Sequence, residues 1–526
     1  MKVSQKQMEK FRSAILNCDT ISCSSFLEKA ETFQFGNYKS LIAFHDALLL
    51  LEAYPSSQEL CDRANSLLRH FEVLTRRFLK KNKTAVDKLV NSGLKGTEVH
   101  GAFTYLLLWG MAFNKNKALF LHSIDDNGIP VADVLRHFLP AGEFETLSAD
   151  YTSEELLEVL FEKEYPLHGL INAMTVTRAT RSLRDQMFDQ MKIYAGIRLD
   201  GSIPDRSTAR GLIHEVFTQS SLEKKVNPME VLSRSLPAPE NLTHEQLQQL
   251  QQHAMFMLAT LNRETDPITN CDLHSTVLFQ LERGYSVALF STTYDLRMPF
   301  ESYIGYMLYR NGVPMAYGGA WVFGNRALFG INIFEPFRGG ESSLVMLQLL
   351  RVYHQYFGIQ SFSVEPYQFG KDNPEGIESG AYWFYYKMGF RSDDRKLAQL
   401  AEKEFAKMQG SKTYRSSHTT LRRFTDSHIT WKLSEAKIFP DPNELSGKIT
   451  AMIREKFAGD RRDAVKAAMG NQDYGDDILR SWALLYYSKG YSFDLYREKI
   501  EELSRLKGVR ERDYNHYLLS LVADFQ

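Results

Sequence analysis

Apolar residues recur at helical spacing through the first half of the chain. One such stretch runs from Ser40 to Ala53 and a second from Ser57 to Phe78, with Pro55 in the turn between them. Apolar side chains at three- and four-residue intervals form one face of an amphipathic helix, so the pair predicts a helical hairpin. Further stretches of this kind lie at 153–161, 178–194, 207–217 and 244–261. We therefore expect an all-α region of helical hairpins up to about residue 265.

Beyond residue 270 the pattern changes from helical to extended. Tyr303–Arg310 is followed by Asn311-Gly312, a strong signal for a two-residue hairpin turn, and Val313–Phe323 is the expected partner strand. Arg326–Phe334 predicts a third strand, which is apolar on both faces and therefore central. The three strands are expected in meander order.

A glycine-containing loop, Arg338–Ser343, then leads into a long helix that we expect to end at Gly358. Ile359–Glu365 predicts a fourth strand and Ser427–Leu433 the last one. Between these two strands lies ESGAYWFYYKMGF, residues 378–390, in which five aromatic residues follow one another on a predicted helix.

Breaks in the pattern divide the chain into three regions. Proline-bearing or turn-rich segments at 235–243 and 263–270 mark the first boundary, and Pro440 with Pro442 mark the second. The predicted regions are a large all-α N-terminal region (1–265), an α/β (α+β) domain with a mixed, mostly antiparallel sheet (270–435), and a small helical C-terminal region (440–526).

The amino-acid composition argues against several classes of function. The chain has 526 residues, 44% of them hydrophobic, and a net charge of -1, which lacks the basic excess of a nucleic-acid surface. Its four cysteines include no C-x-x-C pair, so we expect neither disulfides nor a metal. No apolar run approaches the roughly 20 residues that span a bilayer. We expect a cytoplasmic protein that binds neither nucleic acid nor membrane.

The order of elements from Tyr303 to Phe390 resembles the GNAT N-acetyltransferases. The sequence carries two signatures of that superfamily: Arg338-Gly339 in the glycine loop, and FYYKMGF at Phe384–Phe390, where family members often read L-Y-E-K-L-G-F. The resemblance implies an acetyl-CoA or another acyl-CoA as co-substrate. It also implies an amine acceptor, which the sequence does not identify as a small molecule or a protein.

The resemblance places Tyr385, four residues before Gly389, at the position of the tyrosine that many members use as general acid. A phenol with a pKa of about 10 can protonate a thiolate whose acid has a pKa of about 8.5, which suits the departure of CoA. The alternative is that the ring is packing, and we expect the core for the other rings of the run, Tyr382, Trp383, Phe384 and Tyr386.

In the family the loop reads R/Q-x-x-G-x-G/A, and its N–H groups hold the pyrophosphate at a helix N-terminus. The six residues that correspond to this pattern here are Arg338, Gly339, Gly340, Glu341, Ser342 and Ser343. Ile333, at the end of the central strand, is the seventh residue that the resemblance assigns to cofactor binding. Glu341 stands where the family has glycine, and its carboxylate would repel a pyrophosphate unless it turned away. Alternatively, Glu341 and Ser342 simply cap the helix.

Two carboxylates are candidates for the base. Glu335 follows the central strand and Glu365 ends the next one, and either could take a proton from an amine. Two hypotheses follow. The chain is an N-acyltransferase whose helical half serves the acceptor, or it contains a catalytically degenerate GNAT-like binding module within a mainly helical interaction protein.

Overall fold

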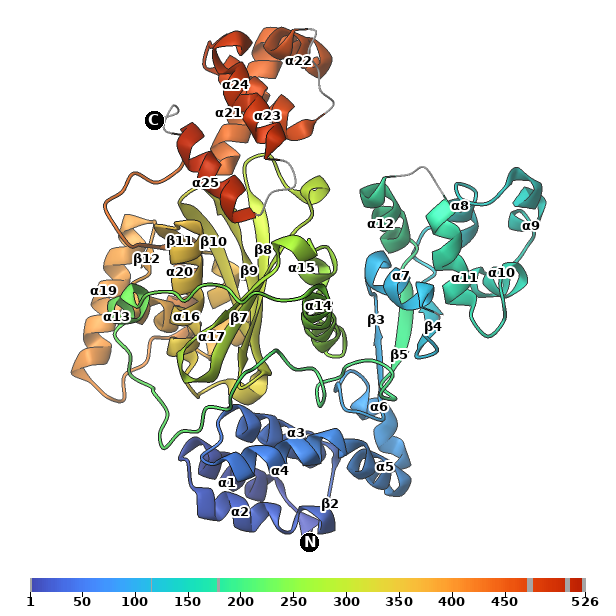
Figure 1. Ribbon diagram of the computed structural model, residues 1–526, viewed down its shortest axis with the longest axis vertical. Coiled ribbons are helices and arrows are strands. Elements are labelled where there is room, and N and C mark those ends of the chain that lie inside the picture. Colours follow the sequence, from blue (N-terminus) through green and yellow to red (C-terminus); the bar gives the residue numbers. More distant parts are fainter. Residues whose placement is uncertain (1, 115, 177–179, 471–475, 507–510, 523–526) are drawn as a thin grey trace.

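The protein is described by a computed structural model that covers residues 2–114, 116–176, 180–470, 476–506 and 511–522. Its elements form four groups in chain order. Figure 1 shows the N-terminal helices at one end, the C-terminal helices at the other, a large sheet between them, and a small α/β unit beside the sheet.

The first group is helical apart from one short parallel strand pair. Its elements are β1 (Lys2–Val3), α1 (Gln5–Leu16), α2 (Thr20–Leu27), β2 (Gln34–Phe35), α3 (Tyr38–Ala53), α4 (Gln58–Arg69), α5 (Phe71–Lys81) and α6 (Val86–Leu89). The predicted helical hairpin is confirmed as α3 and α4, and Ser57 caps the second helix by accepting from the Leu60 N–H.

The second group corrects the prediction that residues 1–265 are all-α. It contains a three-stranded antiparallel sheet in the order β3-β5-β4, made of β3 (Glu98–Gly101), β4 (Leu119–Ile124) and β5 (Ile193–Arg198). Its helices are α7 (Tyr105–Phe113), α8 (Val131–Leu135), α9 (Phe144–Leu147), α10 (Ser153–Leu160), α11 (Pro166–Ala173) and α12 (Arg181–Gln190). The strands have only four to six residues and are separated by helices, so the sequence contains no hairpin-turn signal from which they could be predicted.

An extended segment, residues 199–227, then returns along the first group, where a helix was predicted at 207–217. That prediction is wrong because two backbone donors of this segment bond to the sheet hairpin instead of to a preceding turn of helix. The Gly211 N–H donates to the Gly312 carbonyl at 2.8 Å, and the Phe217 N–H donates to Asn311 Oδ1 at 2.8 Å. Helices α13 (Pro228–Ser233), α14 (His244–Ala259) and α15 (Asp266–Thr269) follow. The first part of the stretch at 178–194, residues 178 and 179, lies outside the described residues.

The third group is an eight-stranded mixed sheet in the order β12-β13-β11-β10-β9-β8-β7-β6. Its strands are β6 (Val277–Gln280), β7 (Tyr285–Ser291), β8 (Ser302–Arg310), β9 (Val313–Phe323), β10 (Arg326–Ile333), β11 (Ser361–Val364), β12 (Arg391–Ser392) and β13 (Ile429–Lys432). The meander and the last strand are confirmed, whereas β6 and β7 were not predicted. Asn311 and Gly312 both have positive φ, as the predicted turn requires. β10 and β11 form the only parallel pair among the described strands of this sheet.

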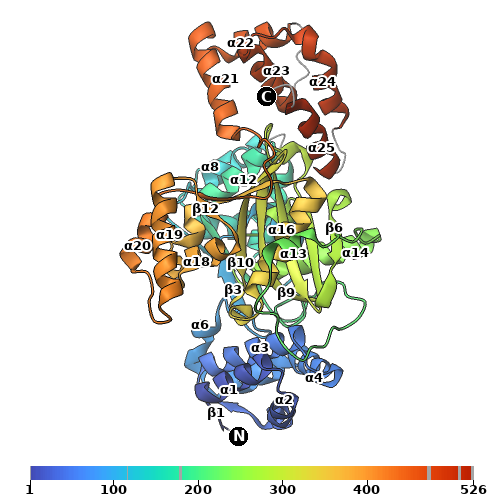
Figure 2. The ribbon, with the colours of Figure 1, turned by 90° about the vertical axis from the view of Figure 1, so that its left-hand side faces the viewer.

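Helices cover both faces of this sheet (Figure 2). α16 (Ser342–Phe357) connects β10 to β11 and packs on one face, where the Tyr353 hydroxyl donates to the Ile304 carbonyl at 2.6 Å. α15 covers the other face, because Pro267 lies over Gly305. α17 (Pro374–Glu378), α18 (Ala381–Met388), α19 (Arg395–Gly410) and α20 (His418–Phe424) lie toward the β12 edge.

The fourth group is helical and consists of α21 (Pro442–Phe457), α22 (Arg461–Met469), α23 (Asp477–Ser488), α24 (Phe493–Arg505) and α25 (Glu511–Val522). Asn515 of α25 joins it to the sheet by hydrogen bonds to backbone. Its amide exchanges two bonds with Gly324 at 2.8 and 2.9 Å and donates to the Phe357 carbonyl at 3.0 Å. One buried side chain thereby holds the β9–β10 turn and the end of α16.

A buried ion pair joins the first and third groups. Arg310 and Glu341 are both fully buried and paired, and Glu341 Oε2 also accepts from the Tyr285 hydroxyl at 2.7 Å. The Arg310 guanidinium lies 4.5 Å from the ring centroids of both Tyr54 and Tyr285. It also donates to the Ala53 carbonyl at 3.2 Å. A single cation therefore holds the end of α3, strand β8 and the start of α16 together.

Replacing this cation should be severely destabilising. Arg310→Met leaves the Glu341 carboxylate in the core without its main partner, so we expect the free energy of unfolding to fall by about 3–5 kcal/mol. Denaturant unfolding would measure it. Arg454→Ala is the control, since Arg454 and Glu455 pair with 71% and 66% of their side chains exposed. A loss below about 1 kcal/mol in Arg310→Met, the range of surface pairs, would contradict the prediction.

Candidate functional site

The parallel strands β10 and β11 separate after a short paired stretch. Their register begins at Arg326↔Ser361 and ends at Leu328↔Ser363, whereas β10 continues to Ile333. The edge of β10 from residue 329 to residue 333 therefore has no strand of the described part of the chain beside it on the β11 side. We call this opening the fork.

Gln368 fills the fork from the turn that follows β11. The 3-10 turn η9 (Pro366–Phe369) carries it, and its Oε1 accepts from the Ile331 N–H at 3.4 Å. A Cβ added to Gly330 would lie 3.4 Å from Gln368 Nε2. The amide thus lies over the glycine and next to the free edge of β10.

The Tyr385 side chain reaches the same amide from α18. Its hydroxyl donates to Gln368 Oε1 at 3.4 Å, and only 3% of the residue is exposed. Burial raises the pKa of the Tyr385 phenol, so the phenol keeps its proton at neutral pH. The sequence-predicted acid is therefore a protonated phenol at the fork.

The other rings of the aromatic run are packing, as predicted. Tyr382 stacks on Phe424 with centroids 4.1 Å apart, and Trp383 packs on Phe405 at 5.9 Å. Tyr382, Trp383 and Tyr386 are buried and Phe384 is partly buried. The Tyr382 hydroxyl has no hydrogen-bond partner among the described residues, although it is buried.

The loop before α16 has an unexpected arrangement at Glu341. Its carboxylate turns into the core, where it pairs with Arg310 and Arg283 and accepts from the Glu223 N–H at 2.6 Å. The alternative that the side chain of Glu341 or Ser342 caps the helix does not hold: Glu341 is the N-cap residue of α16, but no side chain among the described residues makes a cap hydrogen bond there. The carboxylate that would repel an anion therefore points away from the first turn.

The rest of the loop remains open on the outside. Gly339 has φ of +81°, which favours glycine, and Ser342 and Ser343 are partly exposed at the first turn. A helix N-terminus without a side-chain cap presents unpaired N–H donors and favours an anion. Arg338 Nε donates to the Ile333 carbonyl at 3.1 Å, and its guanidinium also pairs with Glu375.

Glu335 and Arg338 line one pocket, of about 400 Å³, between the loop and the N-terminal helices. Arg12 of α1 crosses this pocket and donates to the carbonyls of Pro336 and Arg338, at 2.5 and 2.7 Å. Glu365 is not among the lining residues; it is exposed at the start of η9, where its carbonyl accepts from the Gln368 N–H at 3.0 Å. The two candidate bases thus lie at different places, Glu365 in the turn that carries Gln368.

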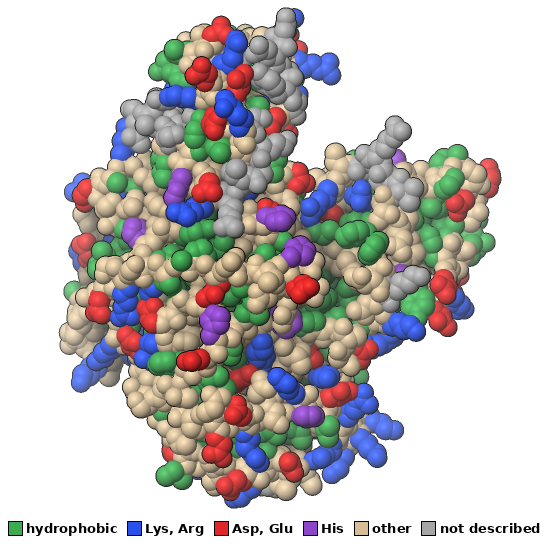
Figure 3. All heavy atoms as spheres, viewed as in Figure 1, with side chains coloured by type: hydrophobic (Ala, Val, Ile, Leu, Met, Phe, Trp, Pro, Cys, Tyr) green, Lys and Arg blue, Asp and Glu red, His purple; other side chains and the backbone are tan. Residues whose placement is uncertain are grey.

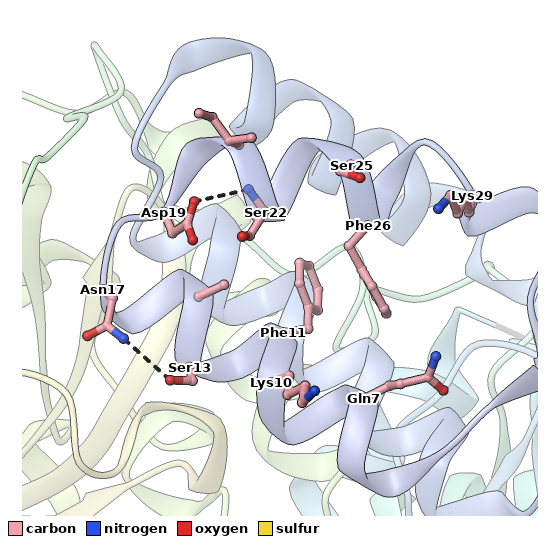
Figure 4. Close-up of a pocket in the computed structure, with 12 residues that line it drawn as sticks. Gln7, Lys10, Phe11, Ser13, Asn17, Asp19, Ser22, Ser25, Phe26 and Lys29 are labelled. Carbon is pink, nitrogen blue, oxygen red and sulfur yellow. Dashed lines mark hydrogen bonds between the residues drawn. The ribbon is translucent and has the colours of Figure 1, made fainter.

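A larger pocket, of about 630 Å³, lies between α1 and α2 (Figure 4). Phe11 and Phe26 stack at its floor with centroids 4.4 Å apart. Its polar groups bond locally: Asn17 donates to Ser13, and Asp19 accepts from the Ser22 N–H as a helix cap. It holds none of the residues predicted from the sequence.

Sequence reasoning missed one constellation, because Ser207 lies far along the chain from His45 and Asp46. His45 Nε2 lies 2.9 Å from the Ser207 hydroxyl, and His45 Nδ1 lies 3.9 Å from Asp46 Oδ1. The order serine, histidine, aspartate resembles a nucleophile with its base. However, His45 and Ser207 are 0% and 2% exposed, so no substrate reaches them. We assign the group a structural role.

Comparisons of the chain with protein-family models, curated proteins and solved structures found no match. Within the described ranges there is no group of three or more His, Cys, Asp or Glu side chains that could hold a metal ion. Nor does the described part of the chain include a helix long and apolar enough to cross a membrane. Acidic and basic side chains are interspersed on the face seen in Figure 3.

The buried histidine should make the fold sensitive to acid. Burial lowers the pKa of His45 from 6.5 to about 4, so the unfolded chain takes up a proton first as the pH falls. Stability from this group is complete above pH 6.5 and is lost as the pH falls toward 4. At about 1.4 kcal/mol per pKa unit, the loss is about 3 kcal/mol.

Denaturant unfolding of wild type and His45→Gln at several pH values between 7 and 4 would test this. The difference in stability between the two proteins should shrink as the pH falls. His70→Gln, at an exposed helix end, controls for the loss of a histidine. Parallel pH profiles for wild type and His45→Gln would show that the folded protein accommodates the charged ring.

Proposed function

We propose that the sheet region binds an acyl-CoA and transfers its acyl group to an amine. The observation that carries this proposal is the fork, where a buried, protonated phenol lies beside a stretch of strand edge that no other strand covers. The resemblance of FYYKMGF and Arg338-Gly339 to the GNAT N-acetyltransferases supports the same reading.

Each part of the site would have one task. The uncapped start of α16 and the loop N–H groups would hold the pyrophosphate, and the edge of β10 would hold the pantetheine arm up to the fork. The amine nitrogen attacks the thioester carbon, and the carbon–sulfur bond breaks. The departing thiolate takes the proton of Tyr385, while the ammonium loses a proton to a base.

Glu365 is the favoured base because its turn also carries Gln368, whose amide meets the phenol. Glu335 lines the pocket by the loop instead, away from the turn that carries Gln368, and it remains the alternative. The proton taken from the amine returns to the phenol through solvent, so the cycle leaves the enzyme unchanged.

A second function is favoured by the filled state of the fork. Gln368 occupies the opening, and Arg12 and Glu375 engage the loop. A module that lost its activity would have this appearance, and it would serve as a binding domain in a mainly helical interaction protein. Ligand binding separates the two functions.

Titration calorimetry with acetyl-CoA, a longer acyl-CoA and free CoA tests the first step. We expect a heat of binding with acetyl-CoA. At 100 times its dissociation constant the ligand should stabilise the fold by about 2.7 kcal/mol, seen as a rise in melting temperature. The absence of both effects with all three compounds would exclude the enzyme and leave the binding module.

Removal of the phenol tests the chemistry. Tyr385→Phe keeps the ring and its packing, so we expect turnover to fall by about 10²-fold or more while CoA affinity stays level. The melting temperature should change little, because the lost hydrogen bond, at 3.4 Å, is a long one.

Tyr382→Phe is the matched control, one turn earlier on the same helix. Its hydroxyl is buried without a partner, so its removal should leave activity unchanged and cost no stability. Equal turnover in the two variants would assign Tyr385 to packing.

A further inference from the structure

The fork leaves a backbone group without its usual partner, and Gln368 supplies one. Strand β11 pairs with β10 no further than Leu328, so the Ile331 N–H has no strand carbonyl on that side. A buried N–H without an acceptor is costly, and the Gln368 side-chain carbonyl accepts from it instead. The same oxygen accepts from the Tyr385 hydroxyl.

Gly330 lies beneath the Gln368 amide. The residue has no positive φ, so the backbone conformation does not require glycine there. A Cβ added to it would lie 3.4 Å from the Gln368 amide nitrogen, an ordinary van der Waals contact. The amide therefore packs directly on the strand, at the position where a planar group with a carbonyl would lie.

We infer that Gln368 is a gate whose amide holds the place of the acyl carbonyl when the site is empty. This inference rests on the proposed function. A carboxamide and a thioester each present one sp² oxygen, so an entering acyl group can take over the Ile331 and Tyr385 donors as Gln368 leaves. Free CoA ends in a thiol and has no carbonyl at that end, so Gln368 stays in place when free CoA binds.

The contacts of the gate suit a group that moves. Both hydrogen bonds to Oε1 are 3.4 Å long, beyond the usual range of about 2.5–3.2 Å, and are therefore weak. The neighbouring Phe369 is fully buried and anchors the turn, while Gln368 itself is only partly buried. The side chain can therefore swing out while η9 stays. The gate therefore competes with the acylated co-substrate and not with the CoA product, because only the former takes over both bonds.

Gln368→Ala opens the gate and tests the inference by affinity. Calorimetric titration of the full chain should show acetyl-CoA binding about tenfold more tightly than to wild type, with CoA affinity changed less than threefold. Gln368→Leu, which fills the same volume, should show no gain for acetyl-CoA. Gln355→Ala is the control, since Gln355 lies on α16 and bonds to the Leu232 and Arg234 carbonyls.

Hydrogen exchange on the free proteins gives a second readout that needs no ligand. The Ile331 amide should exchange at least tenfold faster in Gln368→Ala than in wild type, because its acceptor is gone. An unchanged exchange rate would overturn the inference, since Gln368 would then not be the partner of that N–H.

The binding outcomes separate the two claims. If wild type binds acetyl-CoA and Gln368→Ala binds it equally or more weakly, the gate is wrong and the proposed function stands. If neither protein binds acetyl-CoA or CoA, the proposed function fails, and the gate fails with it for want of a ligand.

Discussion

The architecture depends on a cation that has no contact with water. Arg310 is enclosed by two tyrosine rings and bonded to a carboxylate, an amide oxygen and a backbone carbonyl, which come from separate parts of the chain. Removing two charges from water costs several kcal/mol per ion, and good geometry with full hydrogen bonding offsets this cost. The pair as a whole therefore adds little net stability. Removing either partner alone would nevertheless be costly, because the other charge would stay buried without its main partner. Its value lies in fixing how the helices and the sheet meet.

The same pair determines what the glycine loop can do. Glu341 occupies the position at which a carboxylate would face an incoming anion, and the core cations draw it to the opposite side. The outer side of the loop is then formed by Gly339, Ser342 and Ser343, without a carboxylate from Glu341. The direction of a side chain in the loop is thus decided by residues that are distant in the sequence.

Local signals in the sequence were sufficient for much of the sheet. The Asn311-Gly312 turn and the left-handed Gly358 each depend on residues within a few positions of one another. The helix that carries Tyr385 could be predicted for the same reason, because it ends at Gly389. In each case, residues that are adjacent in the sequence determine the backbone conformation.

What the sequence did not reveal depends on contacts between distant residues. The strands β3, β4 and β5 are short and separated by helices, and residues 207–217 take their hydrogen bonds from the hairpin at Asn311. The contact of His45 with Ser207 spans 162 positions, and the direction of Glu341 depends on Arg310. Gln368 belongs to no sequence motif. Its position in the site becomes visible only once β10 and β11 are seen to separate.

The Asn515 contact has a consequence for how the protein is made. The turn that starts the central strand β10 receives its amide partner from a residue 191 positions later. During synthesis the strands of the meander emerge well before residue 515, so the Gly324 N–H and carbonyl wait for that partner or bond to water. The nascent sheet therefore stays incomplete at this corner until translation has passed α25, and a ribosome that stops early releases a sheet whose turn is unsecured.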